Sequence, residues 1–211
     1  STPLYSSAAS DVYKRQCAVE ALLNSVKECG EFLSEGFETK REISVVVVTY
    51  NRPKDVKETV DSLLDQSTEP LEIIVIDDGS NPPLSTKSSI KNLKIIRFDN
   101  EVGLSSARNY GINIAKGEYV AFIDDDAIAD KNWLEEVQKG IENGGDVLGG
   151  PLEPVYEAHP PEWWNERNFG VYAGVGNMFF GLIWGGNMVI KKDIFGRIGV
   201  FKSGIGRQKG K

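Results

Sequence analysis

From residue 43 onward, the hydrophobic and polar positions follow two alternating patterns: short, nearly continuous apolar runs and longer stretches with helical spacing. Each short run has the composition of a strand that is buried on both faces. The runs predict strands over residues 43–49, 71–76, 93–98, 119–123 and 146–152. The helical spacing predicts helices over residues 56–66, 104–115 and 134–141. Strands that alternate with helices form βαβ units, so the pattern predicts an α/β fold with a mainly parallel sheet flanked by helices.

The two ends of the chain differ from this regular middle part. Residues 1–16 are small and polar without any period, and we expect a non-native leader that takes no part in the fold. Residues 17–40 carry apolar positions at helical spacing and predict an N-terminal helical extension. Residues 41–211 are expected to form one domain, in which a Pro-, Trp- and Gly-rich region after Pro151 faces the substrate. This region is followed by a predicted turn at 184–186, a strand over 187–190 and a short helix over 191–196.

Polar residues directly follow three of the predicted strands. In parallel sheets, ligands bind at the carboxyl ends of the strands, so these residues are expected to line one site. The clusters are Thr49-Tyr50-Asn51-Arg52, Asp77-Asp78-Gly79-Ser80 and Asp124-Asp125-Asp126. The sequence therefore predicts a polar binding site at the carboxyl edge of the sheet.

The adjacent carboxylates of the last cluster repel one another, which is costly unless a cation or solvent relieves the repulsion. In an extended segment, Asp124 and Asp126 point to the same side. That arrangement suits a hard divalent ion that takes its other ligands from water and substrate phosphates. The alternative is a solvated acidic turn before the helix at Trp133. A calcium-binding loop is excluded, because Ile128 and Ala129 occupy the positions of a required ligand and a required glycine.

Other side chains of these clusters offer contacts to a nucleotide. A carboxylate after the second strand can accept hydrogen bonds from a base or a ribose hydroxyl, although an ordinary Asp-Gly turn explains the same residues. Tyr50 offers a ring for stacking on a base, and Asn51 and Arg52 offer hydrogen-bond donors. Arg108, in the predicted helix 104–115, is placed to reach a phosphate or the acidic cluster, and its alternative role is a surface ion pair.

Four motifs follow one another along the chain: VVVVTYNRP, IIVIDDGS, NEVGLSSARNYGINIAKGEYVAFIDDDA and WGGNMVIKKDIFGRIGVF. In this order and spacing, residues 43–200 resemble the family 2 glycosyltransferases, which have the Rossmann-like, nucleotide-diphospho-sugar-binding GT-A fold. The resemblance implies that Asp124 and Asp126 hold Mg²⁺ or Mn²⁺. It places the nucleotide on Thr49, Tyr50, Asn51, Arg52, Asp78, Arg108 and Asp125. It also places the donor sugar and the acceptor beside Trp184, Gly185, Gly186 and Asn187.

The resemblance implies an inverting glycosyltransferase that transfers a sugar from a nucleoside-diphosphate sugar to an acceptor hydroxyl, with the metal stabilising the leaving diphosphate. In this family, a carboxylate after the last motif deprotonates the acceptor. No Asp or Glu follows Asp193, so we expect the general base beyond Lys211 and a domain that is incomplete at its C-terminus. The alternatives are a non-catalytic nucleotide-sugar-binding module and a nucleotidyltransferase, which usually has a Gly-rich, basic phosphate loop after its first strand.

The composition narrows the choice of partners. The 211 residues carry 24 Lys and Arg against 31 Asp and Glu, a formal net charge of -7, without a basic run. Nucleic acid is therefore not an expected partner. No apolar run reaches the ~20 residues that span a bilayer, and we expect a cytoplasmic protein that takes a nucleoside-diphosphate sugar and a glycan or lipid-linked acceptor. A lipid-linked acceptor would bring the full-length protein to the inner face of the membrane as a peripheral protein.

Overall fold

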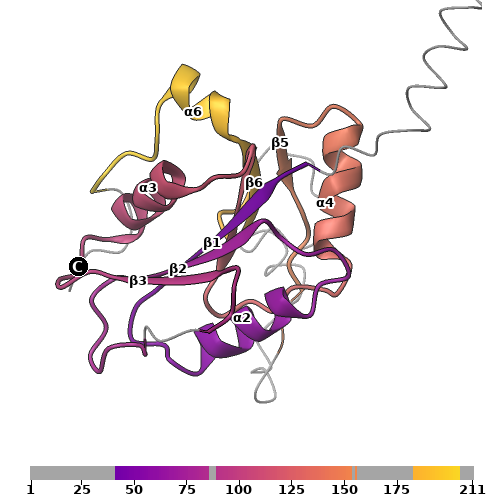
Figure 1. Cartoon of the computed structure of the whole chain (residues 1–211). Helices are drawn as coiled ribbons and strands as arrows, with labels where there is room; N and C mark the ends of the chain where they lie inside the picture. Colours follow the sequence, from indigo (N-terminus) through magenta and orange to yellow (C-terminus); the bar gives the residue numbers. More distant parts are fainter. Residues whose placement is uncertain (1–40, 86–88, 154, 156–182, 205–211) are drawn as a thin grey trace, which may run out of the picture. The chain divides into compact units, whose positions relative to one another are not determined.

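The computed structural model describes residues 41–85, 89–153, 155 and 183–204 (Figure 1). The predictions for residues 1–16, 17–40 and 156–182 lie outside the described residues. The elements are β1 (Ile43–Thr49), α2 (Asp55–Leu64), β2 (Glu72–Asp77), β3 (Leu93–Arg97), α3 (Leu104–Ile114), β4 (Tyr119–Asp124), α4 (Trp133–Glu142), β5 (Val147–Gly149), β6 (Asn187–Lys191) and α6 (Lys192–Ile198). Every strand and helix predicted within the described part is present. None of the helices described here combines the length and the hydropathy of a membrane-spanning segment.

The described strands form a six-stranded sheet in the order β3-β2-β1-β4-β6-β5. β3, β2, β1 and β4 are parallel, whereas β6 is antiparallel to both β4 and β5. The predicted mainly parallel sheet is confirmed. Because the crossovers from β1 to β2 and from β3 to β4 step in opposite directions along the sheet, right-handed connections place α2 and α3 on opposite faces.

β5 is shorter than the strand predicted over residues 146–152. It pairs with β6 only at Val147–Gly149. The next residues are Gly150 and Pro151, and proline has no N–H to continue a ladder of hydrogen bonds. The apolar pattern therefore predicted the strand but not its early end.

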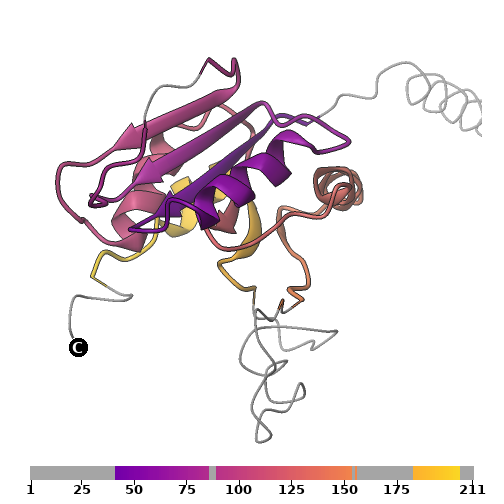
Figure 2. The same ribbon diagram turned by 90° about the horizontal axis from the view of Figure 1, so that it is seen from below.

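Helices cover both faces of the sheet (Figure 1 and Figure 2). On β1, the side chains of Ile43, Val45 and Val47 pack with α2 and α4, whereas Val46 packs with α3 and α6. A strand between two apolar layers needs hydrophobic residues at successive positions. This arrangement explains why the central strands appear in the sequence as continuous apolar runs.

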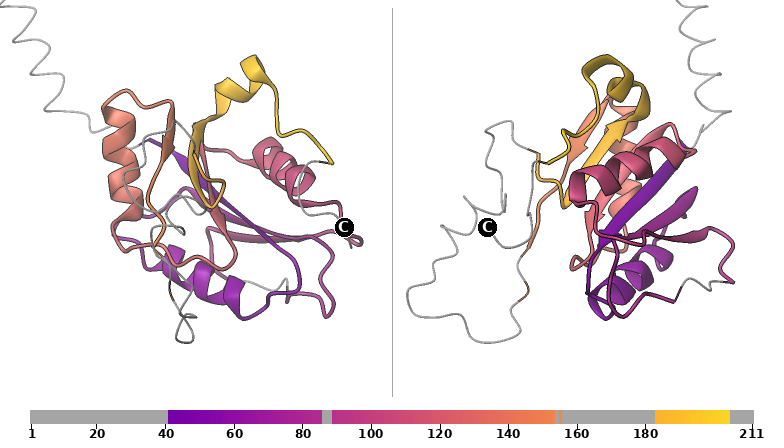
Figure 3. Two further views of the ribbon diagram at one scale, coloured as in Figure 1. Left: turned by 180° about the vertical axis from the view of Figure 1, so that it is seen from behind. Right: turned by 90° about the vertical axis from the view of Figure 1, so that its left-hand side faces the viewer.

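α3 lies close to the sheet because its inner face carries small residues (Figure 3). A Cβ at Gly111 would lie only 2.6 Å from Cγ1 of Val46. Ala107, one turn earlier, is fully buried. The close approach brings the neighbouring Arg108 to the carboxyl edge of the sheet.

At the amino edge of the sheet, the buried carboxylate of Glu72 joins three strands and a loop. It accepts hydrogen bonds from the Ser44 hydroxyl at 2.9 Å and the Lys116 N–H at 2.7 Å, and it forms an ion pair with Lys94. The Ser44 hydroxyl also accepts a hydrogen bond from the N–H of Gly117 at 2.9 Å. Burial raises the pKa of Glu72, but the ion pair and the hydrogen bonds outweigh burial and hold this pKa below its ordinary value.

We expect Glu72→Gln to lower the free energy of unfolding by about 1–3 kcal/mol at neutral pH, because the buried network loses a charged acceptor. The folded pKa lies below the unfolded pKa, so the carboxylate stabilises the fold above the unfolded pKa. This contribution disappears as the pH falls through the folded pKa. In urea denaturation, the difference between wild type and variant should therefore shrink below about pH 4.

The matched control is Glu142→Gln, which removes an exposed carboxylate of α4. It should change the free energy of unfolding by less than about 0.5 kcal/mol. Equal losses in the two variants would contradict the role given to the Glu72 network.

Candidate functional site

The carboxyl ends of β1, β2 and β4 lie side by side. Thr49, the last residue of β1, pairs with Asp77 of β2, and Val48 pairs with Asp124 of β4. The direction of the crossovers changes between β1 and β4, which is the position where open α/β sheets bind ligands. The predicted convergence of the three polar clusters at one edge is confirmed.

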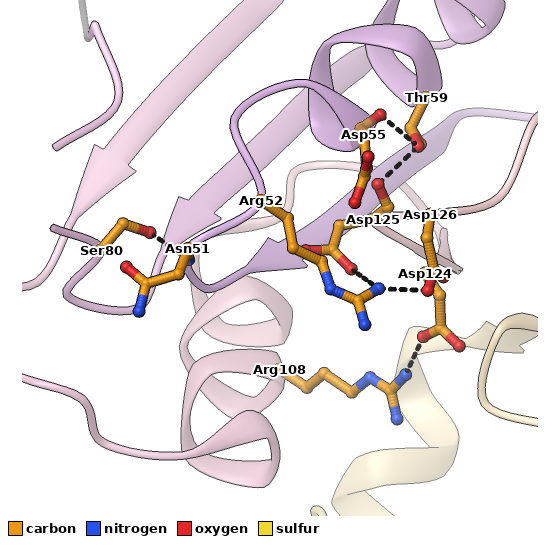
Figure 4. A network of polar contacts seen from close by, with 9 residues as sticks. All are labelled: Asn51, Arg52, Asp55, Thr59, Ser80, Arg108, Asp124, Asp125 and Asp126. Atoms are coloured by element: carbon orange, nitrogen blue, oxygen red, sulfur yellow. Dashed lines mark hydrogen bonds and ion pairs between the residues drawn. The ribbon is translucent and has the colours of Figure 1, made fainter. Parts of the chain in front are cut away.

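The loops after β1 and β2 are joined by hydrogen bonds (Figure 4). The N–H of Asn51 donates to Oγ of Ser80 at 2.8 Å, and Oδ1 of Asn51 accepts from the N–H of Asn81 at 2.7 Å. Asn51 has a φ of 58°, in the left-handed region that asparagine adopts more readily than most residues. Asn51 thus holds two loops of the site together, and its contact with a nucleotide stays a prediction.

Asp77 is fully buried and holds the turn after β2. Its carboxylate accepts hydrogen bonds from the N–H of Ser80 at 2.9 Å and of Leu84 at 3.1 Å, and from Nη1 of Arg97 at 2.6 Å. Burial raises the pKa of Asp77, but these hydrogen bonds outweigh burial and keep it below the ordinary value. The sequence did not separate this structural role from that of the adjacent Asp78.

Asp78 holds the loop that precedes α3. The residue is 3% exposed, its Oδ1 accepts from the N–H of Val102 at 2.7 Å, and its Oδ2 accepts from the N–H of Gly103 at 2.9 Å. Burial raises the pKa of Asp78, and the two hydrogen bonds offset only part of this effect. A Cβ at Gly79 would lie 2.7 Å from the backbone nitrogen of Glu101, so the turn requires glycine there. The contact of Asp78 with a base stays a prediction, since both oxygens already accept hydrogen bonds within the chain.

The acidic cluster bends at the end of β4. The strand ends at Asp124, and Asp125 and Asp126 lie in a turn, in which the N–H of Ala127 donates to the carbonyl of Asp124 at 3.2 Å. The extended geometry assumed for Asp124–Asp126 is therefore wrong, because the strand has no partner that continues it beyond Asp124.

Two arginines neutralise the cluster from different sides (Figure 4). Arg52 pairs with Asp126 and, at 3.5 Å, with Asp125, whereas Arg108 pairs with Asp124 at 3.0 Å. Burial raises the pKa of both Asp124 and Asp125, and the arginines offset only part of this shift. Three carboxylates face two guanidinium groups, so the cluster keeps a formal charge of -1 when all five groups are ionised.

Arg108 is a fixed part of the site. Its side chain is 13% exposed and also donates to the carbonyl of Gly185 at 2.9 Å. The guanidinium carbon lies 5.8 Å and 5.9 Å from the ring centres of Phe122 and Phe201. Burial lowers the pKa of Arg108, although a guanidinium stays charged in proteins. The alternative of a surface ion pair is wrong.

The turn before β6 lies beside the end of β4, because the two strands are antiparallel. Its two glycines lie against the side chains of Arg108 and Asp124. A Cβ at Gly185 would lie 2.7 Å from Nη1 of Arg108, and a Cβ at Gly186 would lie 2.5 Å from Oδ2 of Asp124. Both glycines therefore belong to the site, where they leave room for the Arg108–Asp124 pair.

Asn187 and Trp184 flank this turn in different ways. Oδ1 of Asn187 accepts from Nε1 of Trp133 at 3.0 Å, and Nδ2 donates to the carbonyl of Pro151 at 3.2 Å. Asn187 thus holds α4 and the residues after β5 in place. Trp184 and Tyr50 are exposed aromatic side chains, and their rings remain available for stacking.

The binding of a divalent cation by Asp124 and Asp126 stays a prediction. The side chains of Asp124 and Asp126 are 47% and 52% exposed. Thr49 is buried, and its hydroxyl makes no hydrogen bond of normal geometry within the described residues, although it acts to lower the pKa of Asp125. In the described part of the chain, no group of three or more His, Cys, Asp or Glu side chains is arranged to hold a metal, so phosphate and water would complete the coordination.

Residues 44–199 match the sequence family described as Glycosyl transferase family 2. The chain belongs to this family. The family 2 chain is 32% identical over 185 residues to the glucosyl-dolichyl phosphate glucuronosyltransferase of Haloferax volcanii, covering 79% of this chain and 58% of that protein. It is 34% identical over 114 residues to glycosyltransferase GlyG of Streptococcus pneumoniae, covering 51% of this chain and 38% of GlyG. It thus spans about half the length of these relatives.

Solved structures share the architecture of this family 2 chain. Mannosyltransferase PcManGT from Pyrobaculum calidifontis, in complex with GDP-Man and Mn²⁺, gives a TM-score of 0.56 at 17% identity, over 92% of this chain and 59% of that one. S. aureus TarS 1-349 in complex with UDP gives a TM-score of 0.56 at 22% identity, over 76% and 49%. These likenesses concern the fold, and the expected GT-A fold is confirmed.

We expect Asp78→Asn to destabilise this family 2 chain by about 1–3 kcal/mol in urea denaturation. An amide offers only one acceptor oxygen to the two N–H groups that Asp78 now binds. Asp99→Asn changes an exposed carboxylate after β3 and serves as the control. Equal stability of wild type and Asp78→Asn would show that these two hydrogen bonds are dispensable.

We expect Arg108→Met to raise the pKa of Asp124 further, because the variant keeps an apolar chain near Phe122 and Phe201 but removes the positive charge. The titration of the Asp124 carboxyl carbon, followed by NMR, measures this shift. Arg41→Met, which removes a cation paired with Glu118, is the control. An unchanged Asp124 titration in Arg108→Met would refute the assigned pairing.

Proposed function

We propose that this chain is the donor-binding part of an inverting, metal-dependent glycosyltransferase, which moves a sugar from a nucleoside diphosphate to an acceptor hydroxyl. The observation that carries this proposal is the half-exposed Asp124–Asp126 cluster at the switch point of the sheet, flanked by two arginines. Membership of family 2 supports it. The solved structure of PcManGT, which shares the fold, is a complex with GDP-Man and Mn²⁺.

Different residues at the carboxyl edge of the sheet are proposed to bind different parts of the donor. Asp126 and Asp124 would hold Mg²⁺ or Mn²⁺, which neutralises charge on the leaving diphosphate when it is bound. Arg52, whose side chain is 38% exposed, is free to turn from Asp126 toward a phosphate. Arg108 stays on Asp124 and adds a fixed positive charge. The exposed ring of Tyr50 would stack on the base.

The donor sugar and the acceptor are assigned to the side of the Gly185-Gly186 turn, next to Trp184. Inversion requires a base that takes the proton of the acceptor hydroxyl. Asp193 does not suit this role. β6 runs away from the site, so that its end, Lys191, pairs with Tyr119 at the amino end of β4. Asp193 follows two residues later, at the opposite edge of the sheet.

The acceptor is proposed to be a glycan or a lipid-linked molecule. The Haloferax volcanii relative is named for glucosyl-dolichyl phosphate. A Staphylococcus aureus relative, 34% identical over 118 residues, is named for poly(ribitol-phosphate). A lipid-linked acceptor would place the full-length protein at the cytoplasmic face of a membrane.

Calorimetric titration with UDP and with GDP, in Mn²⁺ and in EDTA, tests the donor site. Mn²⁺ should strengthen the binding of one nucleotide, and Asp126→Asn should weaken its Mn²⁺-dependent binding by roughly tenfold, about 1.4 kcal/mol. The control Asp61→Asn removes an exposed carboxylate that pairs with Lys57 on α2. Equal affinity in Mn²⁺ and EDTA would refute the metal role. Binding without transfer to any acceptor would favour a non-catalytic nucleotide-sugar-binding module.

A further inference from the structure

One face of α2 is attached to the loop that carries the acidic turn. Oγ1 of Thr59 donates to the carbonyl of Asp125 at 3.0 Å, with the carbonyl of Asp55 in α2 as a second acceptor at 3.2 Å (Figure 4). Oγ of Ser62 accepts from the N–H of Ala129 at 3.1 Å. Thr59 is almost completely buried, so the first of these hydrogen bonds lies directly beneath the turn and is shielded from water.

Gln66, two residues beyond the end of α2, adds further contacts to the same loop. Its Nε2 donates to the carbonyl of Asp130 at 2.6 Å, and its Oε1 accepts from the N–H of Leu134 at 3.0 Å. The side chain therefore joins the end of the loop to the start of α4. The N–H of Ser67 adds a backbone hydrogen bond to the carbonyl of Lys131 at 2.8 Å.

These hydrogen bonds involve backbone atoms of the loop and of the first turn of α4, and none of them involves a carboxylate of the loop. α2 itself is anchored in the core by Val56 and Leu63, which are buried against the sheet. The same helix begins just after Arg52, the partner of Asp126. Both partners of that ion pair are therefore attached to one rigid element.

We propose that Gln66, together with Thr59, is a positioning residue for the Asp125-Asp126 turn. The two side chains fix the backbone path of the turn, and the carboxylates keep the location at which a divalent cation and a diphosphate bind. The effect on ligands rests on the proposed function. The effect on the turn does not, and it can be measured in the free protein.

The chain contains a matched control for Gln66. Gln138 of α4 is equally buried, 8% exposed for each residue. Its Nε2 donates to the carbonyl of Arg41 at 2.7 Å, and its Oε1 accepts from the N–H of Arg41 at 3.1 Å. Gln66 also donates from Nε2 to the carbonyl of Ser62 at 3.2 Å, so Gln66→Met removes three hydrogen bonds to the backbone and Gln138→Met removes two. The loss of stability is expected to be somewhat larger in Gln66→Met. Only Gln66→Met should affect the turn.

Two measurements test the proposal. Each is made on four proteins: the wild type, Gln66→Met, Gln138→Met and Thr59→Val. Amide hydrogen exchange at Ala127, whose N–H closes the turn on Asp124, should accelerate in Gln66→Met and Thr59→Val and not in Gln138→Met. Calorimetry with Mn²⁺ and UDP or GDP should show about tenfold weaker binding in the same two variants. In EDTA, the residual nucleotide affinity of all four proteins should be equal.

The proposal would be overturned if Gln66→Met and Thr59→Val gave the same exchange rate and the same affinity as Gln138→Met. The hydrogen bonds would then contribute only stability. A wild type that binds neither nucleotide would refute the proposed function instead. In that case the exchange at Ala127 alone decides whether α2 positions the turn. Thr59→Val keeps the shape of the side chain and provides a second test if Gln66→Met does not fold.

Discussion

The site depends on the balance of charge at the end of β4. Three consecutive carboxylates lie at one sheet edge, and burial raises the pKa of Asp124 and Asp125. Without cations, the repulsion between them would oppose folding. Arg108 and Arg52 supply the positive charge from two different elements. The loop after β1 and helix α3 bring these two guanidinium groups to the carboxyl edge of the sheet.

The two arginines are held differently, and this difference has a chemical consequence. Arg108 lies near the rings of Phe122 and Phe201 and binds the Gly185 carbonyl as well as Asp124, so moving it would leave a largely buried guanidinium without its partners, which is strongly unfavourable. Arg52 lies at the surface, where an ion pair contributes little stability. Breaking the Arg52–Asp126 ion pair therefore costs little stability, whereas breaking the Arg108–Asp124 ion pair costs much more. A bound cation could therefore replace Arg52 at Asp126, while Arg108 would remain paired with Asp124.

The fold could be predicted from the sequence because burial on both faces forces continuous apolar runs on the central strands. The meeting of the polar clusters at one edge followed from parallel pairing alone. Contacts between distant segments could not be predicted in this way. The tasks of Asp77 and Asp78 differ because loops that lie elsewhere in the sequence donate to each of them. The glycines at 185 and 186 are explained only by the positions of Arg108 and Asp124.

The end of β4 shows the same limit on a smaller scale. Apolar residues stop at Ile123, but a polar residue after a strand is compatible with both a continued strand and a turn. The choice is made by tertiary contacts: neither neighbouring strand pairs beyond Asp124, and Thr59 binds the carbonyl of Asp125. A sequence pattern records which side chains are buried and does not record which backbone groups they bind.

Buried and exposed polar side chains of the site have separate tasks. Asp77, Asp78, Thr59 and Gln66 are buried, and most of their hydrogen bonds are made with backbone groups. Tyr50, Arg52 and Asp126 are more exposed and are not assigned a role in supporting the loops. Precise placement of functional groups requires supporting contacts that do not compete with the ligand. Because the supports here are buried, water does not weaken them, and because they bind backbone, the exposed side chains remain free to meet a nucleotide.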